Sequence, residues 1–577
     1  MIAAFLYSLS AIALLISWLV PNHYQPWLGF YNESIAVLGL LALSTWLLIR
    51  KKNNSQTRIA LPLAALLFLT LTLIPPLQAV LGIILFWGDA WITSLFLAMI
   101  GLSIIVGYGV AGTNGSKLTT TLAIVLLLAA VTSFYLALCQ WFGITLDVWL
   151  LDAPFGGTPY ANIGQRNILA TLFCFGLIAT FYLREGGFVG NISTLLITLL
   201  LLVGLAMTRS RTPFLIMVVL AVWILWKREY LQLKLNKTAV ITGTGIFALL
   251  WFTWPNIAVL VDLTAEPSLG RLEGAASGEI RLTLWRQLIE AAWRQPLSGY
   301  GWNQVSLAQL EVAADSLPST GVQYAHNIII DFILWNSPLL GLALTAVGAW
   351  WFVIRLKECR TLDTWFCLSI LLIMAVHSML ETPHTYAFFL VPAGLCIGVI
   401  EQAHGATKIH IPLWNYALAV LFGWGMLTWV SSEYLAAEED YRLMRFESAK
   451  IGSGTGASSA ADLKLLTQLK EKILLGRTTP STEMTADEIS WMEKTSHRNP
   501  SPENLSKLAL AQGLNGQTDR SARTLQTLEK LYGRRNLQHT KRRWLAYACD
   551  YPELGSVITP WKLEKCINSE EPQGALE

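Results

Sequence analysis

Arginine and histidine residues lie beside apolar segments of this 577-residue chain, where charged groups are unusual. Arg209 and Arg211 stand between two apolar segments, Arg281 lies in a long polar segment, and His326 precedes another apolar segment. A guanidinium is always charged and forks onto two oxygens, which suits a phosphate or pyrophosphate. An imidazole at the same level can take or give a proton near neutral pH. These residue types together predict a transfer reaction on a lipid-linked phosphate.

Further polar side chains recur beside the same apolar segments. They are Gln165, Asn167, Asn327, Glu381, His377 and His384. Gln165 and Asn167 have two open interpretations, a contact with substrate and a helix cap, because asparagine favours the N-cap position. Glu381 either pairs with an arginine or takes part in the reaction directly. His326 itself is open to a structural interpretation, and we interpret His377, His384 and Trp285 as structural.

Membrane-spanning helices must position these side chains. Hydrophobic residues make up 54% of the chain and charged residues 14%, whereas an average soluble domain carries roughly 25% charged residues. Apolar stretches that match a hydrocarbon core of roughly 30 Å recur, and in lipid such stretches must be helices. We predict an all-α, polytopic membrane protein with about thirteen spans. They are expected at residues 2–20, 34–49, 59–75, 90–111, 118–140, 167–183, 192–207, 212–226, 238–254, 327–354, 364–380, 385–401 and 412–430.

The charges of the loops predict which side of the membrane each loop occupies. The basic loops carry residues 50–58, 227–237 and 355–360, and weaker ones carry Lys117, Arg184 and Lys408. By our count of spans all six lie on one side, which the positive-inside rule makes cytoplasmic. The N-terminus is then also cytoplasmic, and an odd number of spans places the C-terminal tail on the opposite, external side. Arg209 and Arg211 lie on that external face, either as an anion site or as side chains snorkelling to the interface.

A long external loop and a polar tail complete the predicted architecture. The loop is expected at about residues 255–325, and its segment 278–293 has the periodicity of an amphipathic helix that lies along the membrane surface. We divide the chain into a membrane domain, residues 1–430, and a soluble helical domain, residues 431–577. Segments 504–513 and 519–531 predict a helical hairpin that resembles one tetratricopeptide-type unit.

The cysteines and the net charge exclude some classes of function. None of the seven cysteines has a spacing typical of a metal site, so we predict no structural metal. Cys549 and Cys566 lie in the tail, where an oxidising compartment permits a disulfide between them. A net charge of +3 gives no sign of a nucleic-acid partner.

Five short motifs together resemble a known family. They are ANIGQRNILA at 161–170, TRSRT at 208–212, Arg281 with Trp285, YAHN at 324–327 and HSMLETPHTYAFFL at 377–390. In order and spacing they are similar to the PglL-type bacterial protein O-oligosaccharyltransferases of the O-antigen ligase superfamily. The resemblance covers the membrane part, and the tail is similar to the C-terminal extension of these enzymes.

The resemblance implies a reaction, its partners and its location. The expected donor is a preassembled glycan on undecaprenyl pyrophosphate, and the acceptor is a serine or threonine of a periplasmic protein, typically a type IV pilin. No metal or nucleotide is expected, and the enzyme would lie in the bacterial inner membrane with its active site and tail facing the periplasm. By motif, His326 matches the catalytic histidine, and Arg211 and Arg281, with Arg209 nearby, match the arginines that face the phosphates. Gln165, Asn167, Asn327 and Glu381 match polar positions of the pattern.

One motif departs from the family, and two other functions stay open. After Glu381 the family pattern has proline, a bulky apolar residue and an aromatic residue, whereas here Thr382 and His384 flank Pro383. The departure leaves the role of this turn open. An O-antigen ligase or a polysaccharide polymerase is the alternative within the superfamily, and the tail of about 145 residues favours a protein acceptor. A transporter is the alternative of another class, but the polar residues cluster on one face and not at the midplane.

Overall fold

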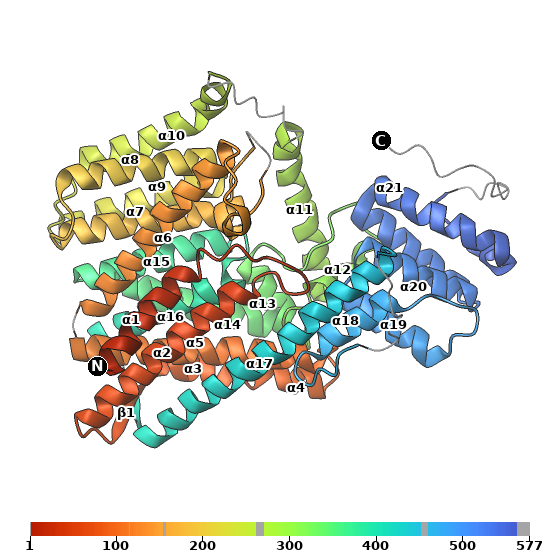
Figure 1. Cartoon of the computed structure of the whole chain (residues 1–577), viewed down its shortest axis with the longest axis horizontal. Coiled ribbons are helices and arrows are strands. Elements are labelled where there is room, and N and C mark those ends of the chain that lie inside the picture. The colour runs from red at the N-terminus through yellow and green to blue at the C-terminus, as the bar shows by residue number, and fades with distance from the viewer. Residues whose placement is uncertain are drawn as a thin grey trace.

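The computed structural model describes residues 2–114, 116–153, 157–260, 270–405, 407–451 and 460–561, and helices dominate it (Figure 1). The predicted all-α, polytopic architecture is confirmed. Among the described residues, eight helices are long and apolar enough to cross a bilayer, so the number thirteen stays a prediction. The helices before residue 261 are α1 (Ile2–Ile16), α2 (Phe30–Asn53), α3 (Leu63–Leu71), α4 (Ile74–Val80), α5 (Trp87–Asn114), α6 (Lys117–Trp141), α7 (Arg166–Glu185), α8 (Asn191–Met207), α9 (Thr212–Arg228) and α10 (Lys237–Leu260).

The second half of the chain supplies the loop helices, the last spans and the tail. These helices are α11 (Gly270–Arg294), α12 (Val305–Ala313), α13 (Ile328–Asn336), α14 (Pro338–Glu358), α15 (Leu362–Ser378), α16 (Ala387–Ala403), α17 (Leu413–Ser448), α18 (Thr467–Arg477), α19 (Ala486–Arg498), α20 (Pro502–Leu514) and α21 (Thr518–Asp550). The segment predicted to be an amphipathic helix, 278–293, lies within α11, which runs crosswise to α8 and α9 (Figure 1). The periodicity predicts an apolar face of Leu282, Trp285, Leu288, Ile289 and Ala292. Leu288 and Ala292 are buried, together with Leu284 and Ala291, whereas Leu282 and Ile289 are exposed.

Two predicted spans are broken into shorter helices. The prediction of one span over 327–354 is wrong, because α13 ends at Asn336 and α14 begins at Pro338. Proline has no N–H to continue a helix, and the Ser337 hydroxyl instead accepts the Leu340 N–H at 3.3 Å. The third predicted span, 59–75, begins in β1 (Arg58–Pro62) and continues as α3 and α4, which together are one of the eight candidate spans (Leu63–Val80); Pro75 and Pro76 lie in the first turn of α4. The first break makes α13 a separate short helix with His326 just before it.

A pair of strands, absent from the prediction, joins two of the basic loops. β1 (Arg58–Pro62) pairs antiparallel with β2 (Lys408–Pro412), in the register Arg58 with Pro412 and Pro62 with Lys408. β1 follows α2 and β2 precedes α17, so the two loops lie at the same end of the bundle (Figure 1).

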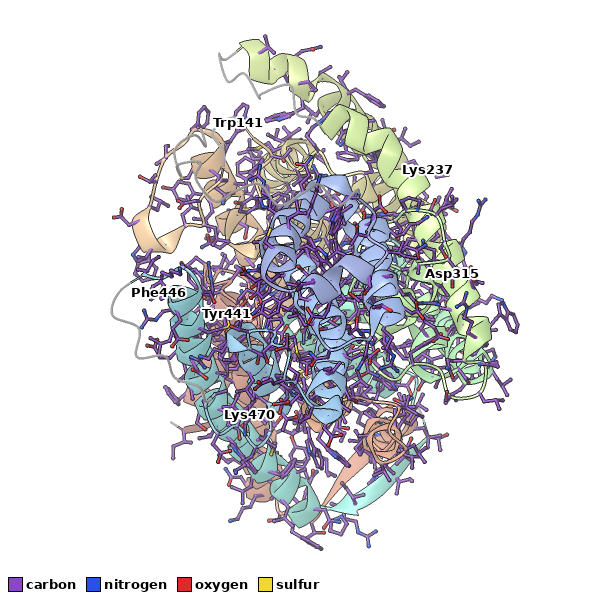
Figure 2. All side chains as sticks on the ribbon, turned by 90° about the vertical axis from the view of Figure 1, so that its right-hand side faces the viewer. Trp141, Lys237, Asp315, Tyr441, Phe446 and Lys470 are labelled. Atoms are coloured by element: carbon purple, nitrogen blue, oxygen red, sulfur yellow. The ribbon has the colours of Figure 1, made fainter. Side chains whose placement is uncertain are left out.

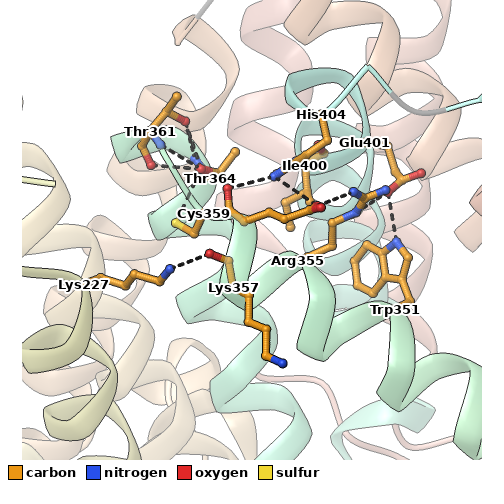
Figure 3. A network of polar contacts seen from close by, with 11 residues as sticks. Lys227, Trp351, Arg355, Lys357, Cys359, Thr361, Thr364, Ile400, Glu401 and His404 are labelled. Atoms are coloured by element: carbon orange, nitrogen blue, oxygen red, sulfur yellow. Dashed lines mark hydrogen bonds and ion pairs between the residues drawn. The ribbon is translucent and has the colours of Figure 1, made fainter. Parts of the chain in front are cut away.

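Polar contacts join three further helix ends at a basic cluster (Figure 3). Lys227 Nζ at the end of α9 donates to the carbonyl of Lys357 at 2.9 Å. Arg355 of α14 donates through Nε and Nη2 to Glu401 Oε1 of α16, at 3.0 and 2.8 Å. The basic residues that end α9 and α14 therefore gather at one end of the helices, as the positive-inside pattern predicts.

The tail begins as a continuation of a membrane helix. α17 has 36 residues and is about 54 Å long, well beyond the roughly 30 Å of a hydrocarbon core. It crosses the predicted domain boundary at residue 430 without a break, so that boundary stays a prediction. Val430 and Tyr434 of α17 pack with Phe30 and with Leu466 of the tail. The tail therefore rests on the membrane part.

The helices α18 to α21 form a separate packed layer at the end opposite the basic cluster. In Figure 2, which views this end, the blue helices α20 and α21 lie between Asp315 on one side and Tyr441 on the other. The predicted hairpin is confirmed, since α20 packs on α21 through Leu510, Leu514 and Leu525. Cys566 lies outside the described residues, so its disulfide with Cys549 stays a prediction.

An ion pair joins the tail to the membrane part. Arg498 of α19 donates through Nε and Nη2 to the two carboxylate oxygens of Asp89 on α5, at 2.8 and 2.7 Å. The two side chains are only 17% and 5% exposed. Breaking such a pair leaves one charge buried without its partner, which typically costs 3–5 kcal/mol.

Arg498→Ala is therefore expected to lower the free energy of unfolding in detergent by about 3 kcal/mol or more. The matched control is Arg523→Ala, because Arg523 pairs with Asp315 at 3.2 Å but both side chains are more than half exposed. An exposed pair contributes about 0–1 kcal/mol. Equal losses in the two variants, measured by chemical denaturation, would contradict the assignment of Arg498 as the anchor of the tail.

Candidate functional site

A histidine and a carboxylate from distant parts of the chain form the centre of the site. His326 Nδ1 lies 2.9 Å from Glu381 Oε2. His326 precedes α13, and Glu381 lies in the turn between α15 and α16. The Glu381 side chain is 3% exposed, whereas that of His326 is 32% exposed. The contact with Nδ1 orients the ring and leaves Nε2 for an incoming group, as in other sites where a base is held by a third residue.

The other carboxylate oxygen of Glu381 gathers two more elements. Its Oε1 accepts a hydrogen bond from Asn167 Nδ2 of α7 at 2.7 Å and an ion-paired hydrogen bond from Arg281 of α11. Burial alone would raise the pKa of Glu381, but the hydrogen bond from His326 and the charges of His326 and Arg281 outweigh it and lower that pKa below its ordinary value. Glu381 is therefore a carboxylate at neutral pH and holds a positive or polarised neighbour on each oxygen.

A hydrogen-bond chain continues to the segment with the two arginines. Ser210 Oγ donates to Asn167 Oδ1 at 2.8 Å, and the Ser210 carbonyl accepts from Trp251 Nε1 at 3.1 Å. Ser210 stands between Arg209 and Arg211 in the turn from α8 to α9. The start of α7, α11 and the start of α13 thus contact Glu381 in the α15–α16 turn, and the α8–α9 turn joins them through Asn167.

The segment that carries His326 is held through both backbone polar groups of Ala325, the residue before the histidine. Trp285 Nε1 of α11 donates to the Ala325 carbonyl at 2.8 Å, and the Ala325 N–H donates to Asp331 Oδ1 at 2.8 Å. His326 itself has φ +53°, a left-handed conformation that few non-glycine residues adopt. The surrounding contacts must hold such a residue in place. We therefore infer that Trp285 and Asp331 position the imidazole.

Trp285→Phe is expected to lower the rate of the transfer reaction predicted from the sequence about 10-fold, while KM for the lipid-linked phosphate changes less than twofold. Phenylalanine keeps the ring packing and removes the donor to Ala325, so the imidazole loses its exact placement, to which reaction rates are sensitive. Trp293→Phe on the same helix is the matched control, since Trp293 is 70% exposed. Wild-type turnover in Trp285→Phe would show that the tryptophan only packs.

Comparison with known proteins relates this geometry to a family. Residues 196–335 match the family model described as O-antigen ligase, and residues 365–544 match one described as the C-terminal part of a virulence factor membrane-bound polymerase. The chain is 24% identical over 541 residues to a general O-oligosaccharyltransferase of Acinetobacter baylyi, covering 91% of this chain and 92% of the relative. It is 27% identical over 386 residues to a ComP-specific O-oligosaccharyltransferase of the same bacterium, covering 67% and 69%. These matches confirm the predicted resemblance to the PglL-type O-oligosaccharyltransferases of the O-antigen ligase superfamily. The first model spans Arg211, Arg281 and His326, and the second spans Glu381.

Two of the predicted arginines differ in their surroundings in this oligosaccharyltransferase. The side chain of Arg211 is exposed at the start of α9, and the described part of the chain offers it no hydrogen bond or ion pair. Arg209 instead donates to the Trp251 carbonyl, and its guanidinium lies over the Trp251 ring, 4.3 Å from the centroid. Arg211 is therefore open to a ligand, whereas Arg209 is engaged with α10.

The remaining predicted residues of the oligosaccharyltransferase lie around this centre with different partners. Asn327 caps α13, because its side chain accepts the Ile329 N–H at 3.0 Å. Gln165 occupies the N-cap position of α7, but its side chain makes no capping bond. His377 is buried and bonds Thr171 at 2.7 Å, and His384 pairs with Asp331 at 3.2 Å. Of the predicted polar set, the structure brings Asn167, Arg281, His326 and Glu381 into direct contact.

The sequence analysis missed Ser210 and Asp331. Ser210 lies inside the TRSRT motif at 208–212, and its position between two arginines could have indicated a role in the site. Asp331 is a fully buried acidic residue in the first turn of an apolar helix, and a charge within a membrane segment is by itself a sign of a functional site. We interpreted Trp285 as structural, and the structure shows a specific contact: its Nε1 donates to the Ala325 carbonyl, in the peptide that joins Ala325 to His326.

Proposed function

We propose that this oligosaccharyltransferase moves a preassembled glycan from undecaprenyl pyrophosphate to a serine or threonine of a periplasmic protein, such as a type IV pilin. It would act in the inner membrane of a bacterium, with the site and the tail facing the periplasm. The observation that carries the proposal is the contact of His326 with Glu381, which also binds Arg281. The two relatives named O-oligosaccharyltransferase support a protein acceptor.

In the proposed reaction, His326 is the general base. Glu381 holds Nδ1, so Nε2 accepts the proton of the acceptor hydroxyl while its oxygen attacks the anomeric carbon of the glycan. A new carbon–oxygen bond forms as the bond from the anomeric carbon to the pyrophosphate oxygen breaks, and the electron pair leaves with undecaprenyl pyrophosphate. The adjacent carboxylate stabilises the imidazolium that results. A base of this kind typically contributes about 10²–10⁴-fold to a rate.

Arginines are proposed to hold the pyrophosphate. The Arg281 side chain is 36% exposed and gives one N–H group to Glu381, so the rest of its fork is available to phosphate oxygens. Arg211 is exposed and unpaired among the described residues, and Ser210 links its turn to the Glu381 centre. Charges placed where negative charge develops on the leaving group stabilise the transition state. Arg209 would act indirectly, by fixing this turn against Trp251. The proposal requires no metal ion or nucleotide.

Two observations separate this proposal from its alternatives. A ligase that acts on a lipid acceptor has less use for a tail of this size, and here the tail is docked to the membrane part through Arg498. A transporter is expected to have its polar site near the midplane. In this protein the Glu381 centre lies at helix ends, in the turns between α8 and α9 and between α15 and α16.

The experiment is to express the chain in a bacterium that makes a lipid-linked glycan, together with a candidate pilin. The expected result is a mass increase of the pilin equal to one glycan, located at a serine or threonine. An unmodified pilin together with glycan on lipid A core would favour the ligase, and longer lipid-linked glycan would favour the polymerase.

A further inference from the structure

The turn that follows Glu381 is joined to the loop of His326 by a second contact. His384 Nε2 lies 3.2 Å from Asp331 Oδ2, and the two side chains are 7% and 0% exposed. Asp331 lies in the first turn of α13, five residues after His326. His384 belongs to the short 3₁₀-helix between α15 and α16 (Pro383–Thr385), three residues after Glu381. The pair therefore joins the same two segments that the contact between His326 and Glu381 joins.

Asp331 uses its two carboxylate oxygens on two different segments. Its Oδ1 accepts the Ala325 N–H at 2.8 Å, and its Oδ2 faces the imidazole of His384. From His384 the turn leads back to Glu381, whose carboxylate contacts the imidazole of His326. The contacts and the two short chain segments thus form a closed cycle, so neither segment can shift without breaking one of the contacts.

The turn that presents His384 is itself held by local contacts. Pro383 has a fixed φ and begins the 3₁₀-helix, in which the Thr385 N–H donates to the Thr382 carbonyl at 3.1 Å. The Thr385 hydroxyl donates to the same carbonyl at 2.8 Å. Because the turn is short and bonded to itself, a displacement of His384 also displaces Glu381.

We propose that His384 is a positioning residue of the transfer reaction and that, through Asp331, it fixes the loop of His326 against the turn of Glu381. This inference rests on the proposed function. The left-handed backbone of His326 must be held by its surroundings, and solvent weakens a buried contact between a carboxylate and an imidazole only slightly. His384 acts through Asp331 and does not itself touch the substrate. An apolar aromatic side chain at position 384 could not make this contact, so the departure of this turn from the family pattern has a function here.

Two replacements of His384 separate the contact with Asp331 from packing. His384→Phe keeps a flat ring near Trp335, whose ring centroid lies 6.2 Å away, and removes the nitrogen that faces Asp331. It is expected to lower kcat for glycan transfer to a purified pilin about 10-fold, while KM for the lipid-linked donor changes less than twofold, because rates depend steeply on the placement of the reacting groups. His384→Gln places an amide nitrogen near the position of Nε2 and is expected to keep kcat within about threefold of the wild type.

His404→Phe is the matched control, at the basic cluster (Figure 3). His404 Nε2 lies 3.2 Å from the Glu358 carbonyl and 4.0 Å from Glu358 Oε2, so this change also removes a contact between a histidine and an acidic residue. Its kcat is expected to equal that of the wild type. Equal losses of kcat in His384→Phe and His404→Phe would overturn the proposal, and so would a His384→Gln variant as slow as His384→Phe.

Hydrogen–deuterium exchange of the purified full-length protein tests the contact without any transfer. The Ala325 N–H donates to a buried carboxylate, so its exchange is expected to be slow in the wild type. His384→Phe is expected to speed exchange in segment 322–327 about 10-fold, and His384→Gln is expected to leave it unchanged. Unchanged exchange in His384→Phe would overturn the proposal. Faster exchange in that variant, together with a wild type that transfers no glycan, would support the contact between the two segments and overturn the proposed transfer.

Discussion

Glycan transfer is expected to fall by about 10²–10⁴-fold when His326 is replaced by asparagine, with binding of the donor nearly unchanged. Asparagine tolerates the left-handed backbone at this position, where φ is +53°, so the loop before α13 keeps its path. It cannot accept the proton of an attacking hydroxyl as imidazole does. The rate of glycan transfer to a purified pilin, together with the donor affinity, measures the effect.

His410→Ala is the matched control for this variant. His410 is exposed on β2, at the end of the helices that carries the basic cluster. Its replacement is expected to leave transfer at the wild-type rate. Transfer by His326→Asn at more than one tenth of the wild-type rate would contradict the base role, whereas loss of donor binding would make His326 a binding residue.

Glu381→Gln is expected to lower turnover by about 10²-fold or more, which makes it the second large effect. The carboxylate accepts from Asn167 and Arg281 on one oxygen and holds His326 on the other. The amide of glutamine has only one acceptor oxygen, so it cannot both hold the imidazole of His326 and accept the hydrogen bond from Arg281. Glu290→Gln on α11 is the control, because its side chain is 53% exposed and it is expected to be neutral. Equal activities of the two variants would show that Glu381 serves only the fold.

The same carboxylate predicts a dependence of stability on pH. Since the folded protein lowers the pKa of Glu381 below its ordinary 4.5, the ionised group stabilises the fold fully at neutral pH. That stabilisation is expected to disappear as the pH falls below about 4.5 and through the lowered pKa. The wild type should therefore lose more thermal stability than Glu381→Gln between pH 6 and pH 3. Parallel losses in the two proteins would contradict the ion-paired state of Glu381.

The helical architecture follows from the sequence because the pattern that specifies it is local. An apolar run long enough for the bilayer is a helix wherever it occurs, so the ranges of α5, α6 and α15 were close to their predicted spans. Breaks and extensions were harder to predict. Ser337 and Pro338 divide a run that is apolar on both sides, and α17 continues past residue 430 because its polar part is also helical.

The sequence predicted which residues belong to the site, but it did not predict which of them contact one another. Glu381 bonds Asn167 across 214 positions and Arg281 across 100, and no periodicity links such residues. The sequence also could not show that two neighbouring arginines have different surroundings. Arg209 lies on the Trp251 ring, whereas Arg211 is exposed.

The central claim is a single displacement in which His326 takes the hydroxyl proton and arginines hold the departing pyrophosphate. The most direct test is the anomeric configuration of the product, determined by nuclear magnetic resonance on a glycopeptide made from a donor of known configuration. In-line attack predicts that the sugar–serine or sugar–threonine bond has the opposite configuration to the sugar–phosphate bond. Retention would contradict the account, because it requires a second displacement through a covalent glycosyl enzyme, with a nucleophile such as Glu381 in place of a base.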